Sequence, residues 1–117
     1  MSDHQRVQRH LLLCATPSKA LCHQGPMGAQ CWDQLKRSLR NSGLEDPQRP
    51  EGVVLRSKVD CLRHCADGPV MLIWPDGIWY VGLTPERIER IVSEHLLHGA
   101  PIEAWISHRS SLATNGP

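Results

Sequence analysis

The chain of 117 residues contains no phenylalanine, and its aromatic side chains are four tryptophans and one tyrosine. It also lacks an excess of charge of either sign, because 13 lysines and arginines face 12 aspartates and glutamates for a formal net charge of +1. These cations are dispersed, so neither a nucleic-acid-binding segment nor a basic membrane-binding helix is expected. No apolar run approaches the ~18 residues of a membrane span. The segment Met1–Gln8 also lacks the apolar run that forms the core of a secretory signal peptide. We therefore expect a cytoplasmic protein that binds neither nucleic acid nor membrane.

The overall composition indicates one ordinary folded domain. Hydrophobic residues make up 40% of the chain and charged residues 21%, which is near the average for soluble globular proteins. A chain of this length can bury a single modest core. We expect a flexible N-terminus over residues 1–6, one domain over residues 7–106, and a disordered polar tail over residues 107–117.

Apolar periodicity predicts an alternation of strands and helices. Strands are expected at Val7–Leu13, Val53–Val59, Val70–Trp74 and Ile78–Val81. A helical stripe runs from Ala29 to Leu39 and ends before Gly43. A second helix begins at the N-cap Thr84 and ends at Gly99. The right-handed crossover rule makes the first two strands parallel neighbours, and the hairpin adds antiparallel ones. The predicted fold class is therefore α/β, with a thioredoxin-like mixed sheet of four strands, built from a βαβ and a ββα unit and flanked by helices.

The cysteines indicate a metal site. An odd number of cysteines, five, in an apparently cytosolic chain argues against a disulfide framework. Four of them form two groups beside predicted strands, and these groups are Cys14 with Cys22 and Cys61 with Cys65. A structural zinc site of four sulfurs and a set of buried core thiols are the alternatives. The spacing argues against zinc, because seven residues separate the cysteines of the first pair, whereas about two to four residues separate the cysteines of a zinc knuckle.

Around the second cysteine pair the sequence carries a specific combination of motifs. The segment Cys61–Val70 holds the pair and a Gly-Pro dipeptide, Trp74–Tyr80 reads Trp-Pro-Asp-Gly-Ile-Trp-Tyr, and Thr84–Glu86 opens a helix. In this order they resemble the thioredoxin-like 2Fe-2S ferredoxins, in particular the short cyanobacterial members. Those proteins are similar to the C-terminal domain of the small 2Fe-2S subunit of respiratory NADH dehydrogenase. The resemblance covers roughly Leu11–Ile106 and is densest over Cys61–Leu97.

The resemblance implies a small soluble one-electron carrier that does not itself transform a substrate. It places a 2Fe-2S cluster on four cysteine ligands, which are Cys14, Cys22, Cys61 and Cys65. It also implies a reductase and an electron-accepting enzyme as redox partners, and a homodimer. Ligation by four cysteines predicts a low reduction potential, about −400 mV as in plant-type ferredoxins.

Three further residues near the expected cluster need an interpretation. Cys22 lies in a loop before a helix, where backbone N–H groups favour a thiolate, whereas Cys31 lies inside that helix and is expected to be a buried apolar thiol. His64 lies between two ligand cysteines, and because the ligand set is already complete we expect it to face solvent or the second coordination sphere. Pro69 occupies a place where thioredoxin-like folds often keep a cis proline.

Two other functions remain open from the residues alone. The first is a thiol-disulfide oxidoreductase that uses Cys61 and Cys65 as its redox pair. Three residues separate these cysteines, whereas thioredoxin-type catalysis uses two and places the attacking thiolate at a helix N-terminus. The second is an interaction module in which zinc or no metal occupies the site.

Overall fold

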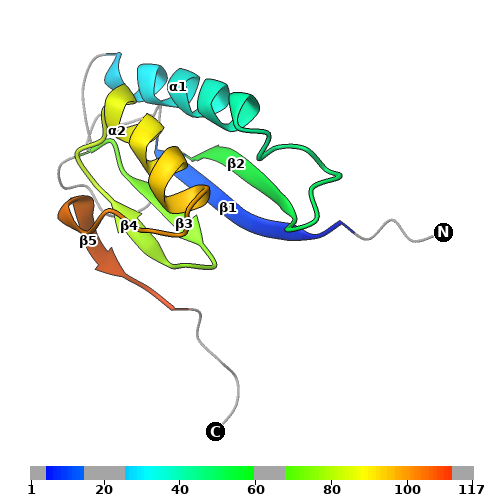
Figure 1. Cartoon of the computed structure of the whole chain (residues 1–117). Helices are drawn as coiled ribbons and strands as arrows, with labels where there is room; N and C mark the ends of the chain where they lie inside the picture. The colour runs from blue at the N-terminus through cyan, green and yellow to red at the C-terminus, as the bar shows by residue number, and fades with distance from the viewer. Residues whose placement is uncertain (1–4, 15–25, 60–67, 112–117) are drawn as a thin grey trace, which may run out of the picture.

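The computed structural model describes residues 5–14, 26–59 and 68–111. Its strands, labelled in Figure 1, are β1 (Val7–Cys14), β2 (Val53–Val59), β3 (Met71–Trp74), β4 (Ile78–Tyr80) and β5 (Ile106–Arg109). Its helical elements are α1 (Met27–Asn41), α2 (Pro85–Arg90), a π-helical continuation over Ile91–Leu96, and a short 3-10 turn over Glu103–Trp105. None of the helices in these ranges is long and apolar enough to cross a membrane.

The strands form one mixed sheet in the order β2-β1-β3-β4-β5. The β1–β2 pair is parallel, and the remaining neighbours are antiparallel. Both long helices lie on the same side of this sheet and pack against each other (Figure 1). The predicted α/β class, the parallel crossover and the antiparallel hairpin are confirmed.

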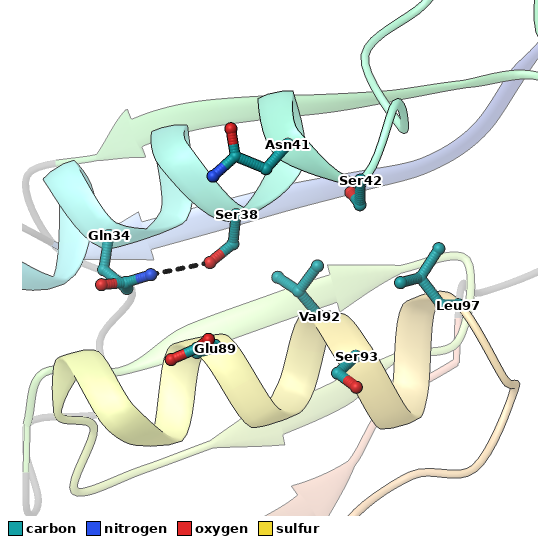
Figure 2. Close-up of a pocket in the computed structure, with 8 residues that line it drawn as sticks. All are labelled: Gln34, Ser38, Asn41, Ser42, Glu89, Val92, Ser93 and Leu97. Atoms are coloured by element: carbon teal, nitrogen blue, oxygen red, sulfur yellow. Dashed lines mark hydrogen bonds between the residues drawn. The ribbon is translucent and has the colours of Figure 1, made fainter.

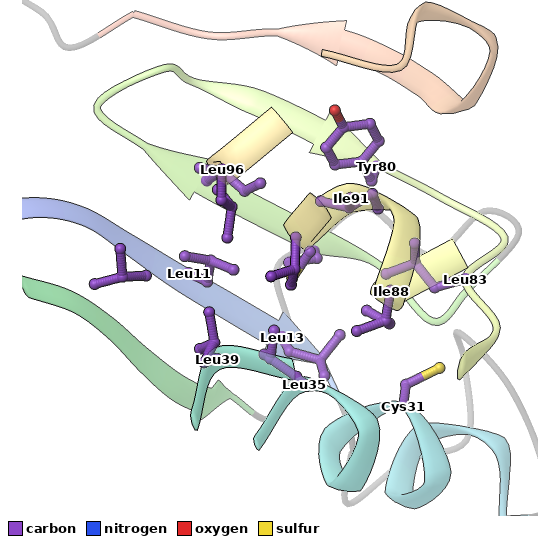
Figure 3. Close-up of a cluster of buried hydrophobic side chains, with 14 of the residues drawn as sticks. Leu11, Leu13, Cys31, Leu35, Leu39, Tyr80, Leu83, Ile88, Ile91 and Leu96 are labelled. Atoms are coloured by element: carbon purple, nitrogen blue, oxygen red, sulfur yellow. The ribbon is translucent and has the colours of Figure 1, made fainter. Parts of the chain in front are cut away.

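The hydrophobic core fills the space between the helices and one face of the sheet (Figure 3). Leu11 and Leu13 of β1 are fully buried there, because alternate residues of a strand point to the same face. From the other side α1 contributes Leu35 and Leu39, which are one helical turn apart and also fully buried. Burial of each leucine stabilises the fold by about 2 kcal/mol.

The sheet has one strand more than the four predicted from the sequence. The added strand is β5, so the ordered domain extends beyond residue 106 and the expectation of a disordered tail from residue 107 is wrong for its first residues. Residues 112–117 lie outside the described part of the chain. Beyond β5 the Ser110 N–H donates to the Gly77 carbonyl at 2.7 Å. Gly77 has a φ of +70°, and a Cβ at this position would collide with the Ser110 carbonyl, so only glycine allows this close approach.

A buried polar network ties the last helix to the sheet. His95 is 1% exposed, and its Nε2 lies 2.8 Å from the Asp76 carboxylate while its Nδ1 lies 2.9 Å from the Tyr80 hydroxyl. Arg9 Nε donates to Asp76 at 3.1 Å, and the Ile102 N–H donates to the Tyr80 oxygen at 3.0 Å. A neutral His95 that carries its proton on Nε2 donates to the carboxylate and accepts from the hydroxyl, so it satisfies each member of the network.

Candidate metal centre

Cys14 is the anchor of the candidate site. It is the last residue of β1, it is fully buried, and its backbone N–H donates to the Val70 carbonyl at 3.0 Å. The peptide bond between Gly68 and Pro69 is cis, as the sequence comparison with thioredoxin-like folds led us to expect. The Pro69 carbonyl accepts from the Leu83 N–H at 3.3 Å. The C-terminal end of β1, the start of β3 and the segment after β4 therefore meet at one end of the sheet.

The other three proposed ligands, Cys22, Cys61 and Cys65, lie outside the described residues, and so does His64. The two segments that hold them begin at neighbouring positions of the sheet. Residues 15–25 follow Cys14, and residues 60–67 follow Val59, which is the β2 partner of Cys14 in the parallel register. The structure thus brings together the starting points of both cysteine-bearing segments.

The surroundings of Cys31 make it an unsuitable metal ligand. The side chain is fully buried among core residues of α1, β1 and α2 (Figure 3). Burial, together with the negative charge of Glu86, raises the pKa of the Cys31 thiol to about 12. Metal ligation requires the thiolate, which is disfavoured here at neutral pH. The expectation of a buried apolar thiol at Cys31 is confirmed.

Two tryptophans near this end of the molecule carry stacked cations that the sequence analysis did not identify. Arg87 and Arg90 lie 4.7 and 5.0 Å from the centre of the Trp105 ring. On the opposite edge of the sheet, Arg56 and Lys58 of β2 lie 5.0 and 5.5 Å from the centre of the Trp32 ring. The spacing of Arg87 and Arg90, three residues apart on α2, is the sequence signal that predicts a shared helix face. Trp105 could not be placed from sequence, because it comes from a different element.

The groove between the two helices is not a competing metal site (Figure 2). It has a volume of about 230 Å³, and Gln34 Nε2 donates to the Ser38 hydroxyl at 2.9 Å along its wall. Its lining is mostly hydroxyl, amide and aliphatic groups, with one carboxylate: Gln34, Ser38, Asn41, Ser42, Glu89, Val92, Ser93 and Leu97. Within the described ranges, no three histidine, cysteine or acidic side chains are grouped closely enough to hold a metal ion.

Comparison with known proteins finds relatives that are 2Fe-2S ferredoxins. The sequence matches no protein-family model. It is 30% identical over 99 residues to a 2Fe-2S ferredoxin from Clostridium pasteurianum, covering 82% of this chain and 92% of the relative. It is 28% identical over 98 residues to a 2Fe-2S ferredoxin from Aquifex aeolicus, covering 84% of this chain and 87% of the relative.

A solved structure shows that the chain has a thioredoxin-like fold. The crystal structure of the thioredoxin-like 2Fe-2S ferredoxin from Aquifex aeolicus superposes with a TM-score of 0.64 and 26% sequence identity. The superposition covers 86% of this chain and 97% of the other. From the sequence relationship and the shared fold together, we conclude that this chain belongs to the family of thioredoxin-like 2Fe-2S ferredoxins.

Proposed function

We propose that this protein is a one-electron carrier that holds a 2Fe-2S cluster through four thiolates, those of Cys14, Cys22, Cys61 and Cys65. The observation that supports this most directly is the position of Cys14, which is buried at the end of the sheet where both cysteine-bearing segments begin. When bound, such a cluster supplies reversible one-electron chemistry. Thiolates are its usual ligands, so the chemistry of the donor set fits the group.

The surrounding chain positions the ligand and limits access of water. Cys14 is the last residue of a strand with a hydrogen-bonded neighbour on each side, which fixes the direction of its side chain. Leu13 and Val70 beside it are fully buried and exclude solvent from its backbone. A rigid and water-poor setting of this kind affects the reduction potential of a cluster.

Metal analysis of anaerobically purified protein tests the proposed function. We expect two irons and two acid-labile sulfides per chain, with visible absorption that bleaches and a rhombic EPR signal that appears on dithionite reduction. One zinc per chain, or no metal, would contradict the electron-carrier function and favour a structural or interaction role. Turnover in an insulin-reduction assay by iron-free protein would instead favour thiol-disulfide exchange at Cys61 and Cys65.

We further propose a homodimer in which the second copy covers the sheet face opposite the helices. Leu12, Leu72 and Trp79 form a row across β1, β3 and β4 on this face, because their neighbours in each strand point into the core. In the described part of the chain no helix covers the row (Figure 1). Leu12 and Trp79 are partly exposed, and Leu72 between them is 5% exposed. An apolar sheet face that no helix covers is typical of an interface between identical subunits.

Charge placed in this row should separate the subunits. We expect Leu12→Asp to sediment as a monomer while the unmodified protein sediments as a dimer, because the carboxylate would be buried without a partner in the interface. Leu97→Asp is the matched control, since Leu97 is 44% exposed on the helical side of the molecule. A monomeric unmodified protein, or a Leu12→Asp variant that remains dimeric, would contradict this interface.

We propose that the protein acts in the cytoplasm, where thiols stay reduced and available as cluster ligands. Its partners would be a reductase that supplies the electron and an enzyme that accepts it, while this chain itself transforms no substrate.

A further inference from the structure

The helix α2 carries charges of both signs. Arg87 and Arg90 lie on the face that contacts Trp105. Glu89 lines the groove toward α1 that Figure 2 shows. Glu86 is exposed and lies one helical turn before Arg90. Of the two acidic residues, Glu89 is therefore directed away from the arginines, whereas Glu86 lies beside Arg90.

Stacking holds the two arginines in place on this flank. Arg87 lies 4.7 Å from the Trp105 ring centre and donates from Nη1 to the Gly82 carbonyl at 3.2 Å. It forms no ion pair with any other described residue. Arg90 forms an exposed ion pair with Glu94 at 2.7 Å, which is a weak interaction that an incoming carboxylate can exchange. Both guanidinium groups therefore remain available to an acidic ligand.

The stack is linked to the cluster end of the sheet by a short series of backbone hydrogen bonds. The Trp105 carbonyl accepts from the Val81 N–H at 3.2 Å, directly after β4. Two residues further on, the Leu83 N–H donates to the Pro69 carbonyl at 3.3 Å. Pro69 precedes the residue whose carbonyl accepts from Cys14. The arginines thus lie on the same end of the molecule as the proposed ligand Cys14, on the β4 side.

We infer that Arg87, Arg90 and Trp105, here named the arginine patch, form the docking site for an acidic surface of the redox partner. The inference rests on the proposed function, because it needs a cluster at Cys14 to give docking there a purpose. Arg90 is paired with Glu94 and Arg109 with Glu103, whereas Arg87 has no ion-pair partner among the described residues, so its positive charge is the one that an acidic partner can pair with. Such a charge steers an anionic partner and increases its rate of association.

Oxidation of the reduced protein by small inorganic complexes tests the charge of the patch. The cluster is reduced with dithionite, excess reductant is removed, and one electron then passes to hexacyanoferrate(III) or to hexaamminecobalt(III) in a stopped-flow instrument. At about 20 mM ionic strength, Arg87→Gln should lower the rate with the anionic oxidant about threefold and raise the rate with the cationic one. Both differences should disappear at about 0.5 M salt. Arg87→Lys should retain most of the unmodified behaviour.

Arg40→Gln is the matched control, because Arg40 is exposed in the last turn of α1, away from the end that carries Cys14. Poly-L-glutamate is the probe for an acidic protein surface, and it should slow the reaction with hexacyanoferrate(III) in the unmodified protein but not in Arg87→Gln. Arg90→Gln serves as the second variant if Arg87→Gln does not fold. The inference is overturned if the patch variants match Arg40→Gln with both oxidants, or if poly-L-glutamate affects all proteins equally. Failure of the proposed function is seen separately, as absence of the cluster spectrum before mixing.

Discussion

Cys14→Ala is expected to abolish cluster binding, with iron and sulfide content falling to the background of the assay. The physical reason is that alanine supplies no donor atom, and a cluster with three remaining thiolates has an open iron site that water can attack. Iron analysis and visible absorption of the anaerobically purified variant measure the effect. Because ligand binding stabilises the folded state, the variant should also unfold at a lower temperature than the cluster-loaded protein.

Cys31→Ala is the matched control for this experiment. It removes the same sulfhydryl group from another fully buried position and costs about 1 kcal/mol through the small cavity it leaves. The thiol of Cys31 is held in its protonated form by burial, so its removal should leave the iron content and the spectrum unchanged. If Cys31→Ala lost the cluster while Cys14→Ala retained it, the proposed set of ligands would be wrong.

The second large effect is expected in the network of His95, Asp76, Tyr80 and Arg9. Asp76→Asn should lower the free energy of unfolding by about 2 kcal/mol, because the Arg9 guanidinium loses its counter-charge and the His95 N–H loses a charged acceptor. The apparent midpoint of urea unfolding should then fall by about 1 M. Circular dichroism of the urea series, recorded at pH 8, measures this change.

The same network makes stability depend on pH with a defined sign. Burial lowers the pKa of His95 below its ordinary value, although the hydrogen bond and the charge of Asp76 partly oppose this effect. Burial tends to raise the pKa of Asp76, but the hydrogen bond from His95 and the charge of Arg9 bring it below its ordinary value. The unfolded state therefore binds more protons than the folded state. The stabilisation is complete above the ordinary histidine pKa of about 6.5 and decreases as the pH falls toward the lowered value.

Replacement of His95 by leucine should remove this loss of stability between about pH 7 and pH 5. The control is His98→Gln, because His98 is exposed and its Nδ1 lies 2.7 Å from the Ser93 carbonyl, outside the network. Urea midpoints at both pH values give the slope for each variant. A slope in His95→Leu equal to that of the unmodified protein would show that other groups determine the response to acid.

Local sequence pattern was sufficient for most of the fold. The strand β1 is recognisable from its continuous run of three leucines, and the hairpin from the Pro-Asp-Gly turn between two apolar runs. The last helix is recognisable from Thr84, whose hydroxyl accepts from the Arg87 N–H at 3.2 Å, and from the apolar stripe that follows. The fifth strand has no such pattern, because an edge strand joins the sheet through backbone hydrogen bonds while its side chains stay exposed.

For the site, the order of motifs along the chain was sufficient for the family and for a complete set of candidate ligands. Cys31 could be separated from that set by its place on an apolar helix stripe, and its full burial agrees. The network around His95 could not be inferred, because Arg9, Asp76 and His95 are distant in sequence and meet only when β1 and the last helix pack beside the β3–β4 turn.

In the arginine patch, too, one feature could be predicted from the local sequence and another could not. The spacing of Arg87 and Arg90 follows from helical geometry and can be read from the chain. Their stacking on Trp105 depends on the short turn before β5, which docks on the segment after β4 through backbone hydrogen bonds. Periodic burial and helix capping constrain the residue types at neighbouring sequence positions, so they can be recognised in the sequence. Contacts between distant segments depend on how the chain packs in three dimensions.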